Sequence, residues 1–254
     1  VFENGVFKES GDKPLEPLSY KTMMNLPDNS LLYLDKSGLN YRKANKNVLL
    51  NKIDPAITNS NPGYFHADHH ELWLSNKNGV YHLDADGKVT TYLQGIATVQ
   101  VIKGSNDNMW FTTSNGIYML PRKENRLFIF DKSNGLSNDR VKRITRDKKH
   151  NIWLGLDNGN INKIKQGMSK VDQIEIPDKT NFNTGIKKLL LDEQNESLYF
   201  ASDFGLGVLK NIYRSHPEFS FLKESNNSLF VIKDFSIDKN TGLSLALSSG
   251  VALL

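Results

Sequence analysis

The chain has 254 residues, of which 38% are hydrophobic and 24% charged, and its formal net charge is +4. This composition is typical of a globular protein with one large domain or two small ones, and the absence of cysteine excludes a disulfide scaffold, thiol catalysis and cysteine metal sites. Lysine and arginine are scattered among the acidic residues without a long basic run, so a nucleic-acid partner is not expected.

A short pattern recurs along the chain: an aromatic residue between two apolar ones, with a glycine six residues later. The clear copies, in chain order, pair Trp73 with Gly79, Trp110 with Gly116, Trp153 with Gly159, and Tyr199 with Gly205. Weaker copies surround Gly38 and Gly250, and Gly5 ends another. Successive glycines are 33, 41, 37, 43, 46 and 45 residues apart. A repeat of roughly 40 residues that is built of strands is typical of a β-propeller.

Each repeat can be divided into four short strands. The predicted strands are 65–67, 72–75, 80–83 and 89–93; 99–102, 109–113, 117–120 and 127–130; 140–146, 151–156, a third around 161–163, and 171–176; and 186–191, 198–202, 207–210 and 219–222. A partial blade with third and fourth strands precedes about five whole blades, and one with first to third strands follows them. The sequence therefore predicts an all-β fold, a β-propeller of about six to seven four-stranded antiparallel blades, and leaves open whether the ring is complete.

The aromatic residues of the repeat have a structural explanation. A twisted sheet must bury one face against the next sheet, and a large aromatic side chain fills that space at low entropic cost. Trp73, Trp110, Trp153 and Tyr199 are therefore predicted to lie in the core between blades, and not in a row that stacks on sugars.

The repeat around Trp153 also resembles a known family. Asn134-Gly135-Leu136-Ser137-Asn138 leads into Val141-Lys142-Arg143-Ile144, and Asn151-Ile152-Trp153-Leu154-Gly155 ends at Asn158-Gly159. This order resembles the two-component regulator propeller repeat, and the repeats cover nearly the whole chain. Similar repeats build the periplasmic sensor region of hybrid two-component histidine kinases, while some occur on diguanylate cyclases.

The resemblance implies a ligand-sensing extracytoplasmic domain, 1–254, within a longer, membrane-anchored sensor. By resemblance it would recognise an oligosaccharide or another small nutrient, form a homodimer and signal to a kinase outside this chain. The sequence contains no phospho-acceptor histidine segment and no nucleotide-binding glycine motif, so the 254 residues themselves are predicted not to be an enzyme and to need no cofactor.

A ligand is expected on the face where the fourth-to-first and second-to-third strand loops meet. Hydrogen-bonding amides and guanidinium groups beside an aromatic ring suit a sugar. The residues of these loops with such groups are Tyr64, Asn138, Asp139, Arg140, Phe182 and Asn183. Asn138 also fits the role of a turn former, and this structural role is the favoured one.

No catalytic motif and no metal site are predicted. A Gly-x-Ser-x-Gly elbow and a His-Glu-x-x-His helix are both absent. The candidates for a metal site are His66, Asp68, His69 and His70. They are weak candidates, because neighbouring histidines on one turn rarely converge on one ion.

Two other functions stay open at the level of sequence. One is a protein-interaction scaffold, although the Gly-His and Trp-Asp signature of such propellers is absent. The other is a propeller lyase or hydrolase, which would need catalytic groups that converge from several loops.

Overall fold

The structure is a computed structural model of the chain. It describes residues 2–3, 6–7, 22–25, 31–35, 38–43, 46–51, 64–67, 72–84, 88–124, 126–167, 169–174, 176, 184–202, 205–222, 232–238, 242–247 and 250–253. By internal packing the chain divides into two compact units, residues 1–96 and 97–254. No helix in the described ranges is long and apolar enough to cross a membrane.

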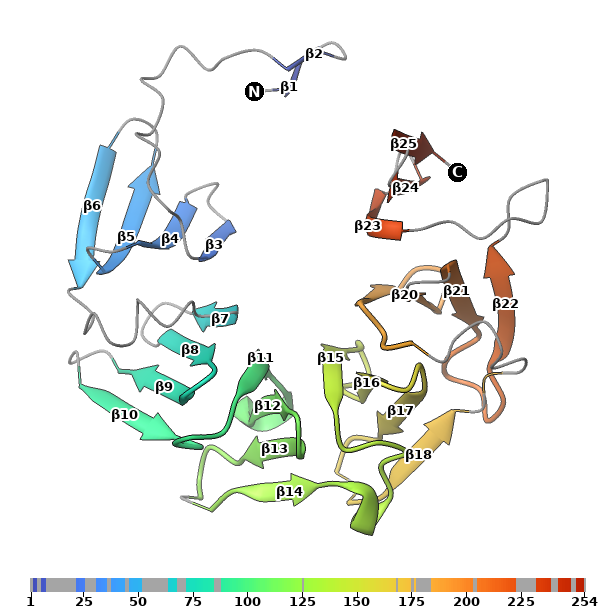
Figure 1. The fold of residues 1–254 in the computed structure, drawn as a ribbon, viewed down its shortest axis with the longest axis horizontal. Helices are drawn as coiled ribbons and strands as arrows, with labels where there is room; N and C mark the ends of the chain where they lie inside the picture. Colours follow the sequence, from blue (N-terminus) through green and yellow to red (C-terminus); the bar gives the residue numbers. More distant parts are fainter. Residues whose placement is uncertain are drawn as a thin grey trace. The chain divides into compact units, whose positions relative to one another are not determined.

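The described residues of the first unit form three antiparallel sheets (Figure 1). A two-stranded sheet is formed by β1 (Phe2–Glu3) and β2 (Val6–Phe7). A four-stranded sheet follows with β3 (Thr22–Asn25), β4 (Leu31–Asp35), β5 (Gly38–Lys43) and β6 (Lys46–Asn51). The third sheet contains β7 (Tyr64–Ala67), β8 (Leu72–Asn76), β9 (Gly79–Leu83) and β10 (Val89–Tyr92).

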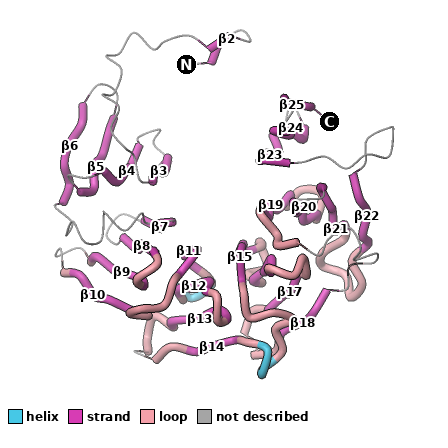
Figure 2. Tube along the Cα trace, in the orientation of Figure 1, coloured by secondary structure: helices cyan, strands magenta, loops and turns pink. Residues whose placement is uncertain are grey.

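In the part of the second unit that the structure describes, the strands form four further antiparallel sheets. They are formed by β11 (Thr98–Lys103), β12 (Met109–Thr113), β13 (Gly116–Leu120) and β14 (Phe128–Phe130); β15 (Val141–Arg146), β16 (Ile152–Leu156), β17 (Ile161–Ile164) and β18 (Val171–Ile174); β19 (Lys188–Asp192), β20 (Ser197–Ser202), β21 (Gly205–Lys210) and β22 (Glu218–Leu222); and β23 (Ile232–Asp238), β24 (Gly242–Leu247) and β25 (Gly250–Leu253). The helices described are two short 3-10 turns, Ser105–Asp107 and Lys132–Asn134 (Figure 2).

Each sheet is an antiparallel meander in which every strand pairs with its neighbours in the chain, and this is the connectivity of a propeller blade. The predicted all-β fold of four-stranded blades is therefore confirmed. Five sheets of the described part have four strands, and the partial sheets at the two ends have two and three, as the repeat pattern predicts. That residues 1–254 form a single propeller region stays a prediction.

Some strand boundaries differ from the prediction for local reasons. The turn glycine pairs across the ladder, so that Gly116 faces Thr113 and already belongs to β13. A side chain there is excluded, because φ is +113° and a Cβ atom would lie 2.4 Å from the carbonyl oxygen of Phe130. Ile186 was predicted to begin a strand, but it lies before β19, because its N–H donates to the Leu156 carbonyl of the preceding blade.

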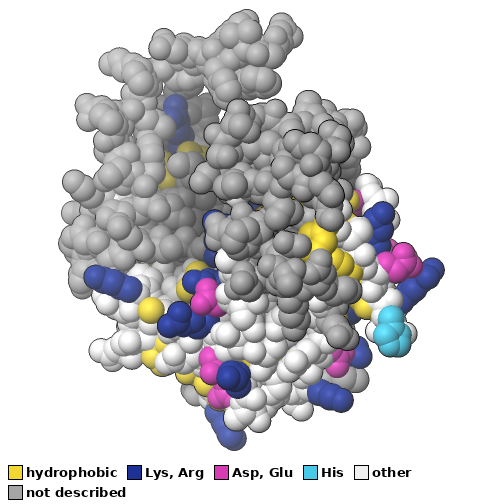
Figure 3. Space-filling view, turned by 45° about the vertical axis from the view of Figure 1, so that its right-hand side comes forward, with side chains coloured by type: hydrophobic (Ala, Val, Ile, Leu, Met, Phe, Trp, Pro, Cys, Tyr) yellow, Lys and Arg dark blue, Asp and Glu magenta, His cyan; other side chains and the backbone are white. Residues whose placement is uncertain are grey.

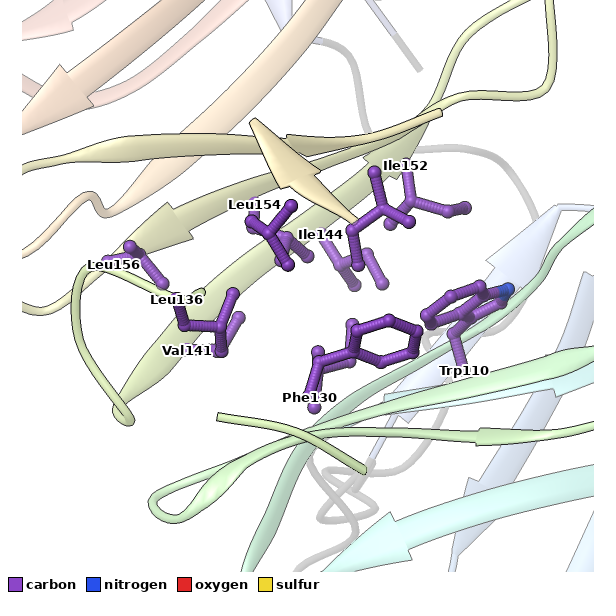
Figure 4. Close-up of a cluster of buried hydrophobic side chains, with 11 residues drawn as sticks. Trp110, Phe130, Leu136, Val141, Ile144, Ile152, Leu154 and Leu156 are labelled. Carbon is purple, nitrogen blue, oxygen red and sulfur yellow. The ribbon is translucent and has the colours of Figure 1, made fainter. Parts of the chain in front are cut away.

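The core of the second unit lies between consecutive blades. Trp110 of β12 and Phe130 of β14 stack with ring centroids 5.6 Å apart. Both belong to one cluster with buried side chains of β15 and β16 from the next blade (Figure 4). Trp153 packs in the same way with Leu198 and Phe200 of the blade after it. The predicted role of these tryptophans between blades is confirmed.

Of the other two aromatic positions, one is buried and one is half-buried. Trp73 is 5% exposed and stacks on His82, with centroids 4.1 Å apart. Tyr199 is half-buried and packs against the cluster that contains Ile232 and Phe235 of the last blade. Because Ile152 and Leu154 enter one core and Trp153 enters the next, the second strand of a blade is buried on both faces.

Candidate ligand-binding pocket

A pocket of about 760 Å³ opens between the β11–β14 blade and the β15–β18 blade. Its walls are the β12–β13 turn, strand β14, the connection 131–140 and the β16–β17 turn. The lining residues are Ser114, Asn115, Tyr118, Ile129, Asp131, Lys132, Ser133, Asn138, Asp139, Arg140 and Asp157. Apart from Tyr118 and Ile129, which lie in strands, these residues belong to second-to-third and fourth-to-first strand loops, where the sequence predicts a ligand.

The connection 131–140 is held by a capping box. Asp131 accepts a hydrogen bond of 2.8 Å from the N–H of Ser133, and its own N–H donates to Asn134 Oδ1 at 2.8 Å. The side-chain hydrogen bond from Ser133 lowers the pKa of Asp131, against a smaller effect of burial. Leu136 anchors the loop because it is buried in the core between blades.

Two of the predicted ligand residues have one side-chain atom engaged in the loop itself. Asn138 Oδ1 accepts the N–H of Arg140 at 2.8 Å, so its predicted role as a turn former is confirmed. Asp139 Oδ1 accepts the N–H of Lys132 at 2.7 Å. These bonds fix both side chains at the pocket, while the amide Nδ2 of Asn138 and the second oxygen of Asp139 make no hydrogen bond within the described residues.

Arg140 is an exposed residue of the pocket, and it forms an ion pair. Its guanidinium lies 3.4 Å from Asp157 and its side chain is 67% exposed. Asp157 also pairs with Lys142 at 3.0 Å. Burial raises the pKa of Asp157, but the hydrogen bonds and charges of Lys142 and Arg140 outweigh it and lower the pKa overall. The carboxylate of Asp157 therefore orients Arg140, whose guanidinium has further N–H donors for a ligand.

The apolar wall of the pocket consists of two side chains absent from the sequence prediction. Tyr118 on β13 and Ile129 on β14 are partners in the antiparallel ladder, so they lie on the same face of the sheet. Ile129 is 40% exposed, which is unusual for an isoleucine in a strand. Alternation along β13 could have indicated the orientation of Tyr118, but the exposure of that face depends on the neighbouring loop.

The side chains of the remaining predicted residues are not among those that the structure describes. Tyr64 lies in β7 of the first unit, and its side chain is not among those described. Phe182 and Asn183 lie outside the described residues. The same holds for the metal candidates Asp68, His69 and His70, and for the side chain of His66. Within the described part, no group of three or more potential metal ligands comes together.

The pocket thus combines an aromatic ring, amide and hydroxyl groups, carboxylates and a guanidinium. Such a set can stack on an apolar ring face and bind several hydroxyl groups at once. Figure 3 shows that lysine and arginine side chains on one face of the described part are interleaved with aspartate and glutamate. The pocket has the same mixed charge, which suits a polar ligand of low net charge.

The fold is similar to that of solved extracellular domains of hybrid two-component systems. The extracellular domain of the hybrid two-component system BT4673 from B. thetaiotaomicron superposes with a TM-score of 0.72 and 16% identity, over 95% of this chain and 32% of that one. For the corresponding domain of BT3049 from the same organism, the TM-score is 0.67 and the identity 16%, over 91% and 33%. The chain thus spans about a third of the length of these domains.

A propeller enzyme is also similar in fold. A streptogramin B lyase superposes with a TM-score of 0.67 and 15% identity, over 95% of this chain and 81% of that one. No protein-family model matches the sequence, and no curated protein does. At these identities the similarity establishes the fold, and it agrees with the resemblance to sensor propellers carried by the repeat around Trp153.

Proposed function

We propose that the chain is a ligand-sensing part of the extracytoplasmic region of a hybrid two-component system. It binds a carbohydrate or another small polar nutrient, and the signal passes to a kinase outside these 254 residues. The observation that carries this proposal is the similarity in fold to extracellular domains of two such systems over more than nine tenths of the chain. The repeat sequence supports it independently.

The pocket beside Arg140 is the proposed binding site. Tyr118 supplies a ring on which an apolar sugar face can stack. Ile129, its partner on the neighbouring strand, adds an apolar surface on the same face of the sheet. Arg140 and Asp139 supply a donor and an acceptor for hydroxyl groups. Both polar residues lie on a loop that the capping box and Leu136 hold in place, so ligand binding would require little ordering of the site.

A thermal-shift screen of the 254-residue chain against neutral oligosaccharides tests this proposal. Binding to the folded state raises the melting temperature by mass action, by an amount that grows with ligand concentration over Kd. A saturable rise for one class of glycan that is lost in Arg140→Ala and Tyr118→Ala would support the proposal. A rise that persists in both variants would place the ligand elsewhere and contradict the assigned site.

The lyase similarity defines the competing function. The same oligosaccharides, and a streptogramin, should be recovered unchanged after incubation with the chain, as chromatography would show. Turnover by the purified chain would replace the sensor proposal by an enzymatic one. Capture of a folded protein partner, without any effect of small molecules, would instead favour an interaction scaffold.

A further inference from the structure

A second hollow of about 900 Å³ lies between the β15–β18 blade and the loop that joins β21 to β22. It is separate from the pocket beside Arg140 and shares no residue with it. Its basic lining residues are Lys163, Lys165, Lys170, Arg214 and His216, and Asp172 is the acidic residue among them. The lining is thus strongly unbalanced toward positive charge.

Lys163 is the unusual member of this group. It stands opposite Trp153 in the ladder, and its ammonium lies 4.4 Å from the centroid of that ring. The residue is 7% exposed, and its Nζ donates to the carbonyl of Ile212 at 3.0 Å. An ammonium has three N–H donors, so this carbonyl satisfies one of them.

The charge of Lys163 is not neutralised by a direct ion pair. Among the neighbouring charges, Asp147 contributes most to the stability of the protonated form of Lys163. The carboxylate of Asp147, however, accepts hydrogen bonds from Asn151 and Trp153. No carboxylate among the described residues forms an ion pair with Lys163. Burial lowers the pKa of Lys163, and Asp147 offsets only part of this effect. A buried cation that lacks a counter-charge favours an anion in the adjacent space.

The surrounding cations differ in how far they are neutralised. Lys165 pairs with Asp172 at 2.8 Å. Arg214 lies 4.0 Å from Glu218 and its side chain is 71% exposed, which is a weak surface pair. Lys170 is exposed, and no ion pair with a described residue holds it. Lys170 and Arg214 are therefore available for an external charge.

We propose that this hollow binds an oxyanion, a phosphate, sulfate or carboxylate group, through Lys163, Lys170 and Arg214. Lysine supplies point charges and arginine a planar fork that can contact two oxygens of one group. The oxyanion is either a free inorganic ion or the acidic group of a sugar. In the second case, which rests on the proposed function, the domain would recognise an acidic substituent of its ligand at a site away from Arg140.

The experiment is calorimetric titration of the 254-residue chain at low ionic strength with sodium phosphate, sodium sulfate and trigalacturonate. The variants are Lys163→Met and the double change Lys170→Gln with Arg214→Gln. Lys123→Gln is the control, because Lys123 is an exposed lysine outside the hollow. Wild type should bind at least one probe, with an affinity that falls as salt is added. The double variant should bind at least about tenfold more weakly, because it loses two cationic donors of charge-assisted hydrogen bonds.

Each outcome decides the proposal. Binding of phosphate or sulfate alone assigns an inorganic ion site, while binding of trigalacturonate assigns an acidic-sugar site, and both support oxyanion chemistry. No binding of any probe would overturn the proposal, and so would an equal loss of affinity in Lys123→Gln. If Lys163→Met does not fold, the double variant still tests the proposal, because both of its changes are at exposed residues. Binding of neutral sugars beside Arg140 should be unchanged in that variant, so this proposal can fail independently of the proposed function.

Discussion

The indole N–H of Trp153 donates a hydrogen bond of 2.8 Å to a carboxylate oxygen of Asp147, six residues before it in the chain. The same carboxylate accepts the backbone N–H and the side-chain amide of Asn151, each at 2.8 Å. Asp147 is 2% exposed. One buried carboxylate therefore closes the first hairpin of the blade and fixes the large ring that fills the core toward the next blade.

Replacement of Asp147 by alanine should destabilise the chain strongly. Three buried donors would lose their acceptor, and an unsatisfied buried donor costs roughly 1–3 kcal/mol. We expect the free energy of unfolding to fall by about 2–4 kcal/mol in urea titrations. Glu124→Ala, at an exposed position, should change it by less than about 0.5 kcal/mol; equal effects of the two changes would refute the role of Asp147.

The hairpin of β11 and β12 has a glycine at the position that corresponds to Asp147. Gly104 lies six residues before Trp110, and a Cβ atom on it would come within 2.4 Å of the indole nitrogen. Its backbone φ of −87° is ordinary, so the close approach of the ring is the constraint. Gly104→Ala should lower the free energy of unfolding by about 1–3 kcal/mol through overpacking.

The comparison for this change is Ser105→Ala, which keeps the backbone hydrogen bond between the Ser105 carbonyl and Asn108. Melting curves of the two variants should separate by several degrees. An unchanged melting temperature for Gly104→Ala would show that the indole can move aside at little cost.

Asp157 should make the stability of the chain depend on acid pH. Its pKa is lowered in the folded state by Lys142 and Arg140, against the effect of burial. The stabilisation is therefore present above the unfolded pKa and is lost as pH falls through the folded pKa. Asp157→Asn should be less stable than wild type at pH 7, by about 1 kcal/mol or less for partly exposed pairs. Urea unfolding from pH 7 to pH 2 should show this difference shrinking, and a constant difference would contradict the account.

Lys163 should make the stability of the chain depend on alkaline pH. Since burial lowers its pKa below the ordinary value of 10.5, the unfolded chain binds more protons between the lowered pKa and 10.5. Stability should rise with pH across that window. Lys163→Met should lack this rise when unfolding free energies are compared from pH 7 to pH 10.5. Parallel curves for wild type and variant would show that the ammonium is solvated in the folded state.

The blades were predictable because their signal is local and repeated. The glycine after each aromatic strand sets a tight hairpin, and the residues around Trp153 alternate between two buried faces. Strand ends were less predictable where another blade takes the hydrogen bond. Ile186 is an example, since its N–H donates to Leu156, thirty positions earlier in the chain.

The candidate sites were predictable only in part, because they form between blades. Asn138, Asp139 and Arg140 stand out in sequence as a polar run on a predicted loop. Tyr118 does not, because a tyrosine after the turn glycine also fits the repeat. Nothing in the sequence marks Lys163 as buried, because the carbonyl that its ammonium contacts belongs to Ile212, forty-nine residues away in the chain.

The measurement that tests the central claim most directly is calorimetric titration of wild type, Arg140→Ala and Tyr118→Ala with the glycan that gives the largest thermal shift. The account predicts one saturable site in wild type, and at least tenfold weaker binding in each variant with no large loss of stability. Binding of equal affinity in all three proteins, or no binding of any glycan by the folded wild type, would contradict the assignment of this pocket to a sensor ligand.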